Sequence, residues 1–414
     1  MEESIFIPYL KARQAFRVDR DILRASYLPD RLPHREAQIE QLAEVLVPAL
    51  RGERPSNLLV YGLTGTGKTA VVKYLEKELR KADALGVVHY LYLNCQVVDT
   101  PYGVLAHIAN SLIPNPADKV PFTGLSVDRV YQLLIEVLDA RKRVVLVALD
   151  EIDRIVAKNG DDFLYQLTKV NEDLNRSSVS LLGISNELKF TEFLDPRVRS
   201  RLGDEKMVFP PYNADELRDI LTQRASLALP QGVVGPEALS LIAALAAHEH
   251  GDARRALDLL RVSAEIAERS GDERITVDHV MKAKNKLELD TVVEAVKSLP
   301  TQAKLILLGV ILNEEVGNSR MTTGEVYGTY RELCRKTGID PLTQRRVTDL
   351  VSELDMLGLV NATVKSYGRG GRTKEVRTSV PVAETKRVLE KDEYLSDLRG
   401  HRLQVQRTLF DPRP

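Results

Sequence analysis

The stretch GLTGTGKT at residues 62–69 has the residue types and spacing of a phosphate-binding loop. It fits the pattern G-x-x-x-x-G-K-[ST] at every position, follows the apolar run Leu58–Val60 and precedes the helical stretch KTAVVKYLEKELRK. Glycines let backbone N–H groups turn inward around phosphates, and a helix that begins near Lys68 adds its positive N-terminal end. The lysine of such a loop reaches the β- and γ-phosphates, and the hydroxyl of Thr69 binds Mg²⁺. We therefore predict that this segment binds ATP or ADP with Mg²⁺ through Gly65, Thr66, Gly67, Lys68 and Thr69.

Two carboxylates, Asp150 and Glu151, end a second apolar run, VVLVALDEID. An acidic residue at this place holds Mg²⁺ through water, the role predicted for Asp150, and its neighbour Glu151 orients or activates the attacking water. Acidic residues at strand ends are common, so the assignment depends on their pairing with the phosphate loop. A further run, LLGISN, ends at Asn186, whose amide could position water beside the γ-phosphate; taken alone, an asparagine there is usually a turn residue.

The elements that must position these residues follow from the apolar pattern. Several runs are continuously apolar, which is typical of parallel strands covered on both faces. Helical stretches separate them, so the first two hundred residues are predicted to form a parallel α/β sheet. The predicted strands are residues 58–61, 87–94, 144–149, 179–185 and 207–209.

After FPPYNADE the pattern becomes wholly helical, beginning at a capping box formed by Asn213 and Glu216. From about Thr291, three helical stretches are followed by two strands around the turn SYGRGGRTKE, which is the pattern of a winged helix. The predicted domains are an α/β nucleotide-binding domain at 1–211, a helical lid at 212–290 and a winged helix with a tail at 291–414.

Composition excludes several classes of protein. The chain of 414 residues is too long for one ordinary core and has no apolar run of the ~18 residues that a membrane span needs. The charged N-terminal segment is unlike a secretory signal. The chain has two cysteines, Cys95 and Cys334, which are far apart in the sequence; this excludes a disulfide framework and a cysteine-based zinc site. The low cysteine content fits a protein of the reducing cytoplasm. If DNA is its partner, we expect the chain to associate with the nucleoid. The net charge of -1 neither supports nor excludes binding to DNA.

Beyond these separate motifs, the chain resembles a known family. The phosphate loop, LDEID, GISN, DPRVRSRL and GDARRALDLL occur in the order found in AAA+ ATPases. The segments SYLPDRLPHREAQIEQLAEVL, VPFTGLS and FPPYNADELRDILTQRA, with the winged helix, closely resemble the archaeal replication initiators. These are homologues of the largest subunit of the eukaryotic origin-recognition complex and of its helicase-loading partner. The resemblance covers nearly the whole chain, except the tail after about Val382, and implies an AAA+ ATPase that works as a slow switch.

The resemblance also implies roles for residues outside the phosphate loop. Asn186 matches sensor 1, and Arg254 matches sensor 2, which reaches the γ-phosphate from the lid; Arg255 is the alternative. Arg201 matches the region of the arginine finger, which acts on a neighbour's nucleotide, with Arg197 and Arg199 as alternatives. The residues implied to lie beside the nucleotide are Leu32, Pro33, Arg35, Tyr212 and Arg224.

Two features concern DNA. The segment NSLIPNPADKVPFTGLSVDRVYQ resembles an insertion by which the initiators touch the minor groove; alternatively it is a Pro-rich surface loop. The start of the third helix in the winged helix and its basic hairpin form the second feature, since such elements dock in the major groove and on phosphates. The alternative for the hairpin is a solvated turn. The predicted DNA contacts are Val120, Phe122, Thr123 and Gly124 in the insertion, and Gln344, Arg345, Arg346, Arg369, Arg372 and Lys374 in the winged helix.

The sequence thus predicts an ATP-dependent initiator that binds duplex origin DNA. Recruitment of the replicative helicase, and assembly with further copies or paralogues on DNA, are implied by the resemblance alone. Two alternatives stay open. One is another AAA+ loader, which would lack the insertion and the winged helix, and the other is a nucleotide-regulated transcriptional regulator.

Overall fold

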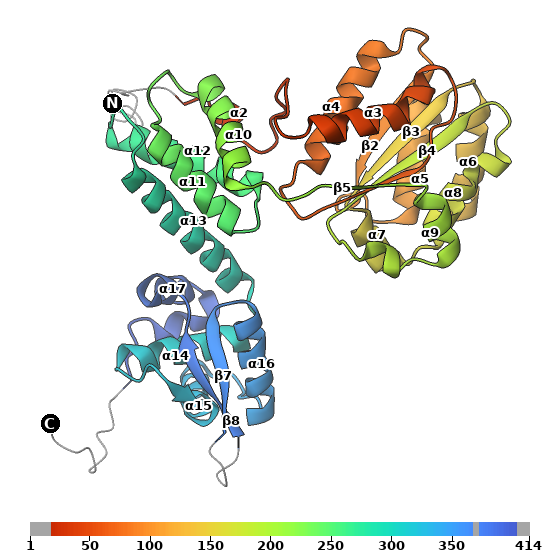
Figure 1. The fold of residues 1–414 in the computed structure, drawn as a ribbon. Helices are drawn as coiled ribbons and strands as arrows, with labels where there is room; N and C mark the ends of the chain where they lie inside the picture. Colours follow the sequence, from red (N-terminus) through yellow and green to blue (C-terminus); the bar gives the residue numbers. More distant parts are fainter. Residues whose placement is uncertain (1–17, 367–371, 404–414) are drawn as a thin grey trace, which may run out of the picture. The chain divides into compact units, whose positions relative to one another are not determined.

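The computed structural model describes residues 18–366 and 372–403, and the chain divides into two compact units between Lys282 and Ala283 (Figure 1). Within the described residues, no helix has the length and apolar character needed to cross a membrane. The two units are taken in turn.

A parallel sheet of five strands forms the centre of the first unit, in the order β2-β3-β4-β1-β5. All seven residues of β3 and all four of β1 are buried, which explains their uninterrupted apolar sequences. The predicted α/β fold class is confirmed. The strands are β1 (Leu58–Tyr61), β2 (Val88–Asn94), β3 (Val144–Asp150), β4 (Ser178–Ser185) and β5 (Glu205–Val208).

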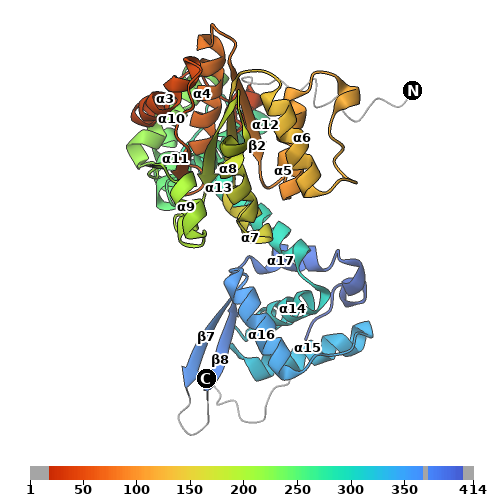
Figure 2. The ribbon, with the colours of Figure 1, turned by 90° about the vertical axis from the view of Figure 1, so that its right-hand side faces the viewer.

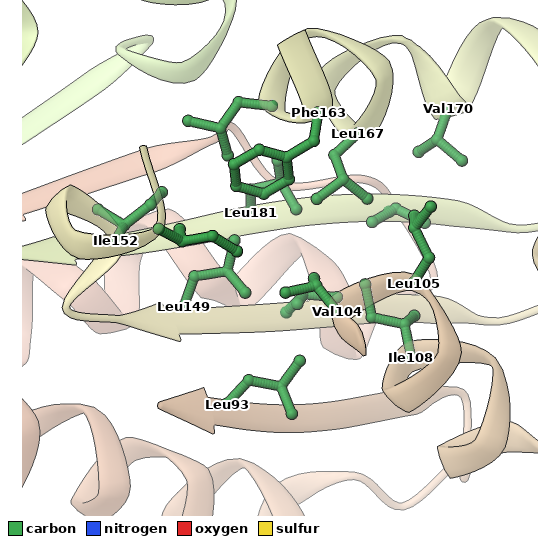
Figure 3. Packing of buried hydrophobic residues seen from close by; sticks show 14 of the residues in the cluster. Leu93, Val104, Leu105, Ile108, Leu149, Ile152, Phe163, Leu167, Val170 and Leu181 are labelled. Carbon is green, nitrogen blue, oxygen red and sulfur yellow. The ribbon is translucent and has the colours of Figure 1, made fainter. Parts of the chain in front are cut away.

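Helices cover both faces of this sheet. On one face, α5 and α8 contribute Val104, Leu105 and Leu167 to a core that includes Leu149 and Leu181 of the strands (Figure 3). Helices α5 and α6 lie side by side on this face (Figure 2). The helices here are α5 (Pro101–Leu112), α6 (Val127–Asp139), α7 (Ile152–Asn159), α8 (Asp162–Asp173) and α9 (Pro196–Leu202), and those on the other face are α3 (Glu36–Leu50) and α4 (Lys68–Ala82).

The register of the sheet sets the place of the chemistry. Tyr61 at the end of β1 pairs with Ser185 of β4, and Asp150 at the end of β3 pairs with Ile184 of β4. The carboxyl ends of β1, β4 and β3 therefore meet at one edge, with β4 between the other two. This edge is where ligands bind in open parallel sheets.

A helical lid follows β5. Helix α10 begins after Asn213 with the predicted capping box, in which Glu216 N donates to Asn213 Oδ1 at 2.9 Å. Helix α13, which was not predicted from the sequence, begins before the boundary between the two units and ends after it, and it includes residues 290 and 291, where a domain boundary is predicted. The helices are α10 (Ala214–Ala228), α11 (Pro236–His248), α12 (Ala253–Ser270) and α13 (Val277–Ser298), and the short α2 (Arg20–Leu23) packs on α10 and α12.

The second unit has the predicted winged-helix fold. Three helices pack with an antiparallel sheet of order β6-β8-β7, in which β6 follows the first helix and β7 and β8 follow the third. Helix α14 is the centre of the core, since it is buried without a break from Leu305 to Asn313. The elements are α14 (Thr301–Glu315), β6 (Met321–Thr322), α15 (Thr323–Thr337), α16 (Gln344–Met356), β7 (Val360–Ser366) and β8 (Arg372–Thr378).

The segment after Val382, which lay outside the family resemblance, belongs to this core. It forms α17 (Val382–Leu389) and a 3-10 helix, η4 (Glu393–Leu398). Leu389 and Leu398 are each 1% exposed, and Lys304 Nζ of α14 lies 2.8 Å from Asp392 Oδ2. The described part of the tail therefore completes the winged helix.

Candidate functional site

A cavity of about 350 Å³ lies in the first unit, between the phosphate loop, the segment that follows α2, and the lid helices α10 and α12. Every residue predicted from the sequence to contact the nucleotide lines it: Leu32, Pro33, Arg35, Gly65, Thr66, Gly67, Lys68, Thr69, Tyr212, Arg224 and Arg254. Residues 25–29 also line the cavity; most of them begin the segment SYLPDRLP that carries the family resemblance, but they were not predicted to contact the nucleotide.

The phosphate loop owes its turn to glycine. Gly65 and Gly67 have φ angles of 71° and 89°, in the left-handed region that other residues rarely adopt. A Cβ on Gly67 would lie 2.7 Å from the hydroxyl of Tyr212, so the loop also requires glycine for close packing. Helix α4 begins directly after Gly67, and its first N–H groups therefore face the cavity side of the loop.

Lys68 is buried and lies within the loop that precedes it. Its Nζ donates to the carbonyls of Gly62 and Leu63, at 2.7 and 2.8 Å. Burial lowers the pKa of Lys68 to about 8, and the nearby Asp150 carboxylate opposes that shift. A phosphate beside this ammonium would favour its charged form, because opposite charges at short range raise a lysine pKa.

Asp150 and Thr69 form the second part of the site. Thr69 Oγ1 donates to Asp150 Oδ2 at 2.7 Å, although the two residues are far apart in the sequence. Carboxylate and hydroxyl oxygens are hard ligands of the kind Mg²⁺ prefers, so the donor set fits the predicted metal. Within residues 18–366 and 372–403, no group of three or more His, Cys, Asp or Glu could hold a metal alone. Phosphate and water would have to complete the coordination.

Tyr92 is a member of this site that the sequence analysis missed. Its hydroxyl donates to Asp150 Oδ2 at 2.6 Å, and Lys73 Nζ lies 4.6 Å from its ring centroid. Because β2 pairs with β3, Tyr92 stands beside the end of the strand that carries Asp150. The sequence could not predict this contact, because it depends on β2 lying next to β3 in the sheet.

Glu151 has an unusual backbone. Its φ is 55°, a left-handed conformation that costs a non-glycine residue on the order of 1 kcal/mol and clusters at functional sites. The carboxylate forms an ion pair with Arg154, with Nε 2.6 Å from Oε2. Asn186 follows β4, between β1 and β3, so it stands at the same sheet edge between the phosphate loop and the acidic pair. The catalytic roles of these residues stay predictions.

Two arginines expected beside the nucleotide use their guanidinium groups within the protein. Arg35 is 2% exposed and donates to Thr66 O at 2.9 Å and to Pro210 O at 2.7 Å, with its guanidinium carbon 3.7 Å from the Tyr212 ring centroid. Arg224 donates to Ile22 O at 2.9 Å and to Tyr27 O at 2.8 Å. These arginines hold the walls of the cavity in place.

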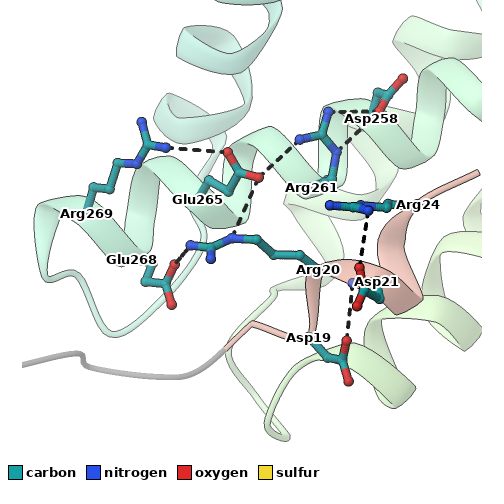
Figure 4. Close-up of polar contacts among 9 residues, drawn as sticks. All are labelled: Asp19, Arg20, Asp21, Arg24, Asp258, Arg261, Glu265, Glu268 and Arg269. Atoms are coloured by element: carbon teal, nitrogen blue, oxygen red, sulfur yellow. Dashed lines mark hydrogen bonds and ion pairs between the residues drawn. The ribbon is translucent and has the colours of Figure 1, made fainter. Parts of the chain in front are cut away.

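The lid arginines differ in their partners. Arg254 is exposed and lines the cavity, whereas Arg255 Nε lies 2.9 Å from Glu249 Oε2. This geometry favours Arg254 over Arg255 as the residue that reaches a phosphate. Arg20 connects α2 to the lid helix α12. Its guanidinium lies 2.5 Å from Glu268 and 3.8 Å from Glu265 (Figure 4).

Arg201 stands apart from the residues that line the cavity. It lies on α9, where its NH1 donates to Glu172 Oε1 at 2.6 Å and its guanidinium carbon is 5.9 Å from the Tyr165 ring centroid. Arg197, one alternative for the finger, is paired with Asp195 at 3.0 Å. An arginine finger that acts on the nucleotide of a neighbouring copy must lie outside the nucleotide cavity of its own chain, and Arg201 does so.

The insertion between α5 and α6 is a fixed loop. Asn110 of α5 accepts from Val120 N at 2.7 Å and donates to Val120 O at 2.9 Å, and Tyr102 donates to Pro121 O at 2.7 Å. Val120 is 4% exposed and packs in the core, so its side chain anchors the loop, and its role as a DNA contact stays a prediction. Phe122 is 56% exposed, its ring 4.8 Å from that of His107, and Thr123 and Gly124 are exposed beside it.

The winged helix presents the start of α16 to solvent. Gln344, Arg345 and Arg346 are its first three residues and all are exposed. Arg346 NH1 lies 3.7 Å from Glu353 Oε1, and Lys374 Nζ of β8 donates to Ser352 Oγ at 2.5 Å. Arg369 lies outside the described residues, and Arg372 is described only by its backbone.

Comparison with known proteins gives a consistent picture. Three family models match: AAA ATPase domain at residues 31–182, Cdc6 AAA+ ATPase-type lid domain at 218–285, and CDC6, C terminal winged helix domain at 294–388. The chain is 51% identical over 409 residues to an ORC1-type DNA replication protein of Thermococcus kodakarensis, covering 98% of each chain. It is 50% identical over 412 residues to ORC1-type DNA replication protein 1 of Methanosarcina acetivorans, covering 99% of this chain and 98% of that one.

A solved structure is similar along almost the whole chain. The ORC1 protein of Aeropyrum pernix, in complex with DNA, superposes with a TM-score of 0.79 at 47% identity, covering 93% of this chain and 100% of that one.

Proposed function

The chain belongs to the archaeal Orc1/Cdc6 family of ORC1-type DNA replication proteins, and from this premise we propose that it binds duplex DNA at replication origins under the control of bound ATP. It is an AAA+ ATPase. The observation that carries the proposal is that one chain holds both a lid-covered phosphate loop and a winged helix with an exposed basic helix start.

In the proposed chemistry, the phosphates lie on the loop of Gly65 to Lys68, and Thr69 with Asp150 would hold Mg²⁺, which supplies charge neutralisation for phosphoryl transfer. Glu151 takes a proton from the attacking water and Asn186 orients that water. Arg254 contacts the γ-phosphate from the lid. Arg201 acts on the nucleotide of a neighbouring copy, so one chain alone turns over slowly and retains ADP as a switch.

The proposed partners are origin DNA at the nucleoid, further copies or paralogues on that DNA, and the replicative helicase. Helicase recruitment rests on family membership. A nucleotide-regulated transcriptional regulator is the second candidate function, since an exposed winged helix would serve it equally. The genomic positions of the binding sites separate the two functions.

Replacing Phe122 by alanine is expected to shorten the DNA footprint on the side of the ATPase unit and to reduce any DNA bend. Apolar side chains that enter the minor groove unstack base steps, and Phe122 is exposed on a loop that Asn110 and His107 hold in place. The measurement is a nuclease footprint of the full chain. Leu85→Ala is the matched control, because Leu85 is 69% exposed elsewhere in the same unit. A full-length footprint at full affinity would leave the winged helix as the sole DNA-binding part.

Replacing Arg345 by alanine is expected to relax sequence preference by roughly 1–3 kcal/mol if it reaches a base edge. Lys374→Ala should instead weaken binding to all sequences and lower the salt slope by about one, the signature of a lost phosphate contact. Titrations of specific and scrambled duplexes at several salt concentrations separate these effects. Arg387→Ala, an exposed arginine of α17, is the control. Equal loss on both duplexes for Arg345→Ala would refute its assignment to a base.

A further inference from the structure

The turn that precedes α12 brings an acidic side chain of the lid against the phosphate loop. A Cβ built on Gly65 would lie 1.8 Å from Oδ1 and 2.1 Å from Cγ of Asp252. The backbone is joined as well, since Ala253 N donates to Gly65 O at 3.1 Å. Gly65 thus serves two purposes, because its left-handed turn shapes the loop and its missing side chain admits Asp252.

The position of this turn is fixed from its other side by the connection between the sheet and the lid. Tyr212 N donates to Gly251 O at 3.3 Å, and a Cβ on Gly251 would lie 2.3 Å from Tyr212 O. The same Tyr212 places its hydroxyl where a Cβ on Gly67 would lie 2.7 Å away. The phosphate loop, Tyr212 and the Gly251–Asp252 turn therefore pack closely against one another.

The carboxylate of Asp252 lies against Gly65 of the phosphate loop, next to the cavity. The two residues that follow it, Ala253 and Arg254, line the cavity together with Lys68. The Asp252 carboxylate also acts to raise the pKa of Lys68, against the lowering by burial, so its field reaches that ammonium. The local role of the carboxylate is to cap α12, with Oδ1 accepting from Arg254 N at 2.7 Å and from Arg255 N at 3.3 Å.

We infer that Asp252 is a specificity-determining residue of the nucleotide site, whose carboxylate opposes the third phosphate and so lowers the affinity for ATP relative to ADP. A carboxylate next to the phosphate loop repels the phosphates of a bound nucleotide, and the repulsion is stronger for the nucleotide that carries one more charge. Accommodation of ATP then moves the Gly251–Asp252 turn away from Gly65, which makes the lid respond to the γ-phosphate. The inference rests on the proposed nucleotide site.

Asp252→Asn separates this role from helix capping. Asparagine caps a helix as well as aspartate does and has the same shape, so both N–H bonds persist while the charge is removed. We expect the ATP affinity to rise about tenfold and the ADP affinity to change by less than about threefold. A tenfold gain is the order of magnitude expected when a repulsion between two unit charges ~10 Å apart is removed from a partly screened site. Calorimetric titrations of the full chain without Mg²⁺ measure both affinities and prevent hydrolysis.

Asp258→Asn is the matched control, because Asp258 lies on the same helix and its charge is paired with Arg261 at 3.0 Å. It should leave both affinities unchanged. Asp252→Ala, which also removes the cap, should lower the melting temperature, whereas Asp252→Asn should not. ATP affinity of Asp252→Asn that is unchanged or weaker, or equal gains for ATP and ADP, would overturn the inference. If the wild-type chain bound neither nucleotide, the nucleotide site itself would be wrong.

Discussion

Lys68→Ala is expected to lower the affinity for both ATP and ADP by about a hundredfold while the fold persists. The Lys68 ammonium is buried and already held at the phosphate loop by the carbonyls of Gly62 and Leu63. Its removal deletes a charge-assisted contact to phosphate, which is worth about 3 kcal/mol in a desolvated site. Calorimetry with each nucleotide measures the loss, and the thermal midpoint without nucleotide reports on folding.

A lysine of the same helix provides the control. Lys77 also lies on α4, but it is exposed and paired with Asp30 at 2.8 Å. Lys77→Ala removes the same charge from the same element and should leave nucleotide affinity within about twofold, because an exposed ion pair contributes little. Unchanged affinity for ATP and ADP in Lys68→Ala would contradict the assignment of the loop.

Glu151→Gln is expected to lower the rate of ATP hydrolysis by about 10²–10⁴, the range for loss of a general base, while ATP stays bound. Glutamine keeps the shape of the side chain but cannot accept the proton of the attacking water. The role is proposed for Glu151 because it has a left-handed backbone and follows Asp150 at the edge of the sheet. Single-turnover hydrolysis at saturating ATP and Mg²⁺ is the measurement.

The neighbouring carboxylates test the division of roles. Asp153→Asn should have a smaller effect than Glu151→Gln, because Asp153 is not assigned a chemical step and contacts the backbone N of Asn186, at 3.3 Å. Asp150→Asn should weaken the Mg²⁺ dependence of binding, since Asp150 is the residue bonded to Thr69. If Glu151→Gln hydrolyses ATP at the normal rate while Asp150→Asn does not hydrolyse it, the two roles are reversed.

The parts of the fold that sequence alone predicted are those with a local signal. Continuous apolar runs identified the parallel strands, because both faces of such strands are buried. The capping box at Asn213 marked the start of the first lid helix, and the phosphate loop is a contiguous motif. Distant residues such as Arg254 were placed only through the family resemblance, since no local pattern distinguishes a lid arginine from a surface charge.

What the sequence did not predict depends on contacts between segments far apart in the chain. Tyr92 reaches Asp150 because β2 lies beside β3, and Val120 packs in the core while Asn110 binds both of its backbone groups. The family resemblance implied that Arg35 lies beside the nucleotide, and the structure shows that its guanidinium also donates to three backbone carbonyls. The helices after Val382 are short, and the burial of Leu389 becomes evident only with the core of the second unit.

The central claim is that nucleotide controls binding to a few defined origin sites, and a genome-wide footprint of the full chain tests it most directly. The chain would be incubated with genomic DNA of its source at one fixed salt concentration, with ATP, with ADP and without nucleotide, beside Lys68→Ala. The account predicts protection at a few discrete sites where replication starts, with an occupancy that depends on nucleotide in the wild type and not in Lys68→Ala. Protection spread over many promoters, or an identical pattern under all conditions, would contradict it.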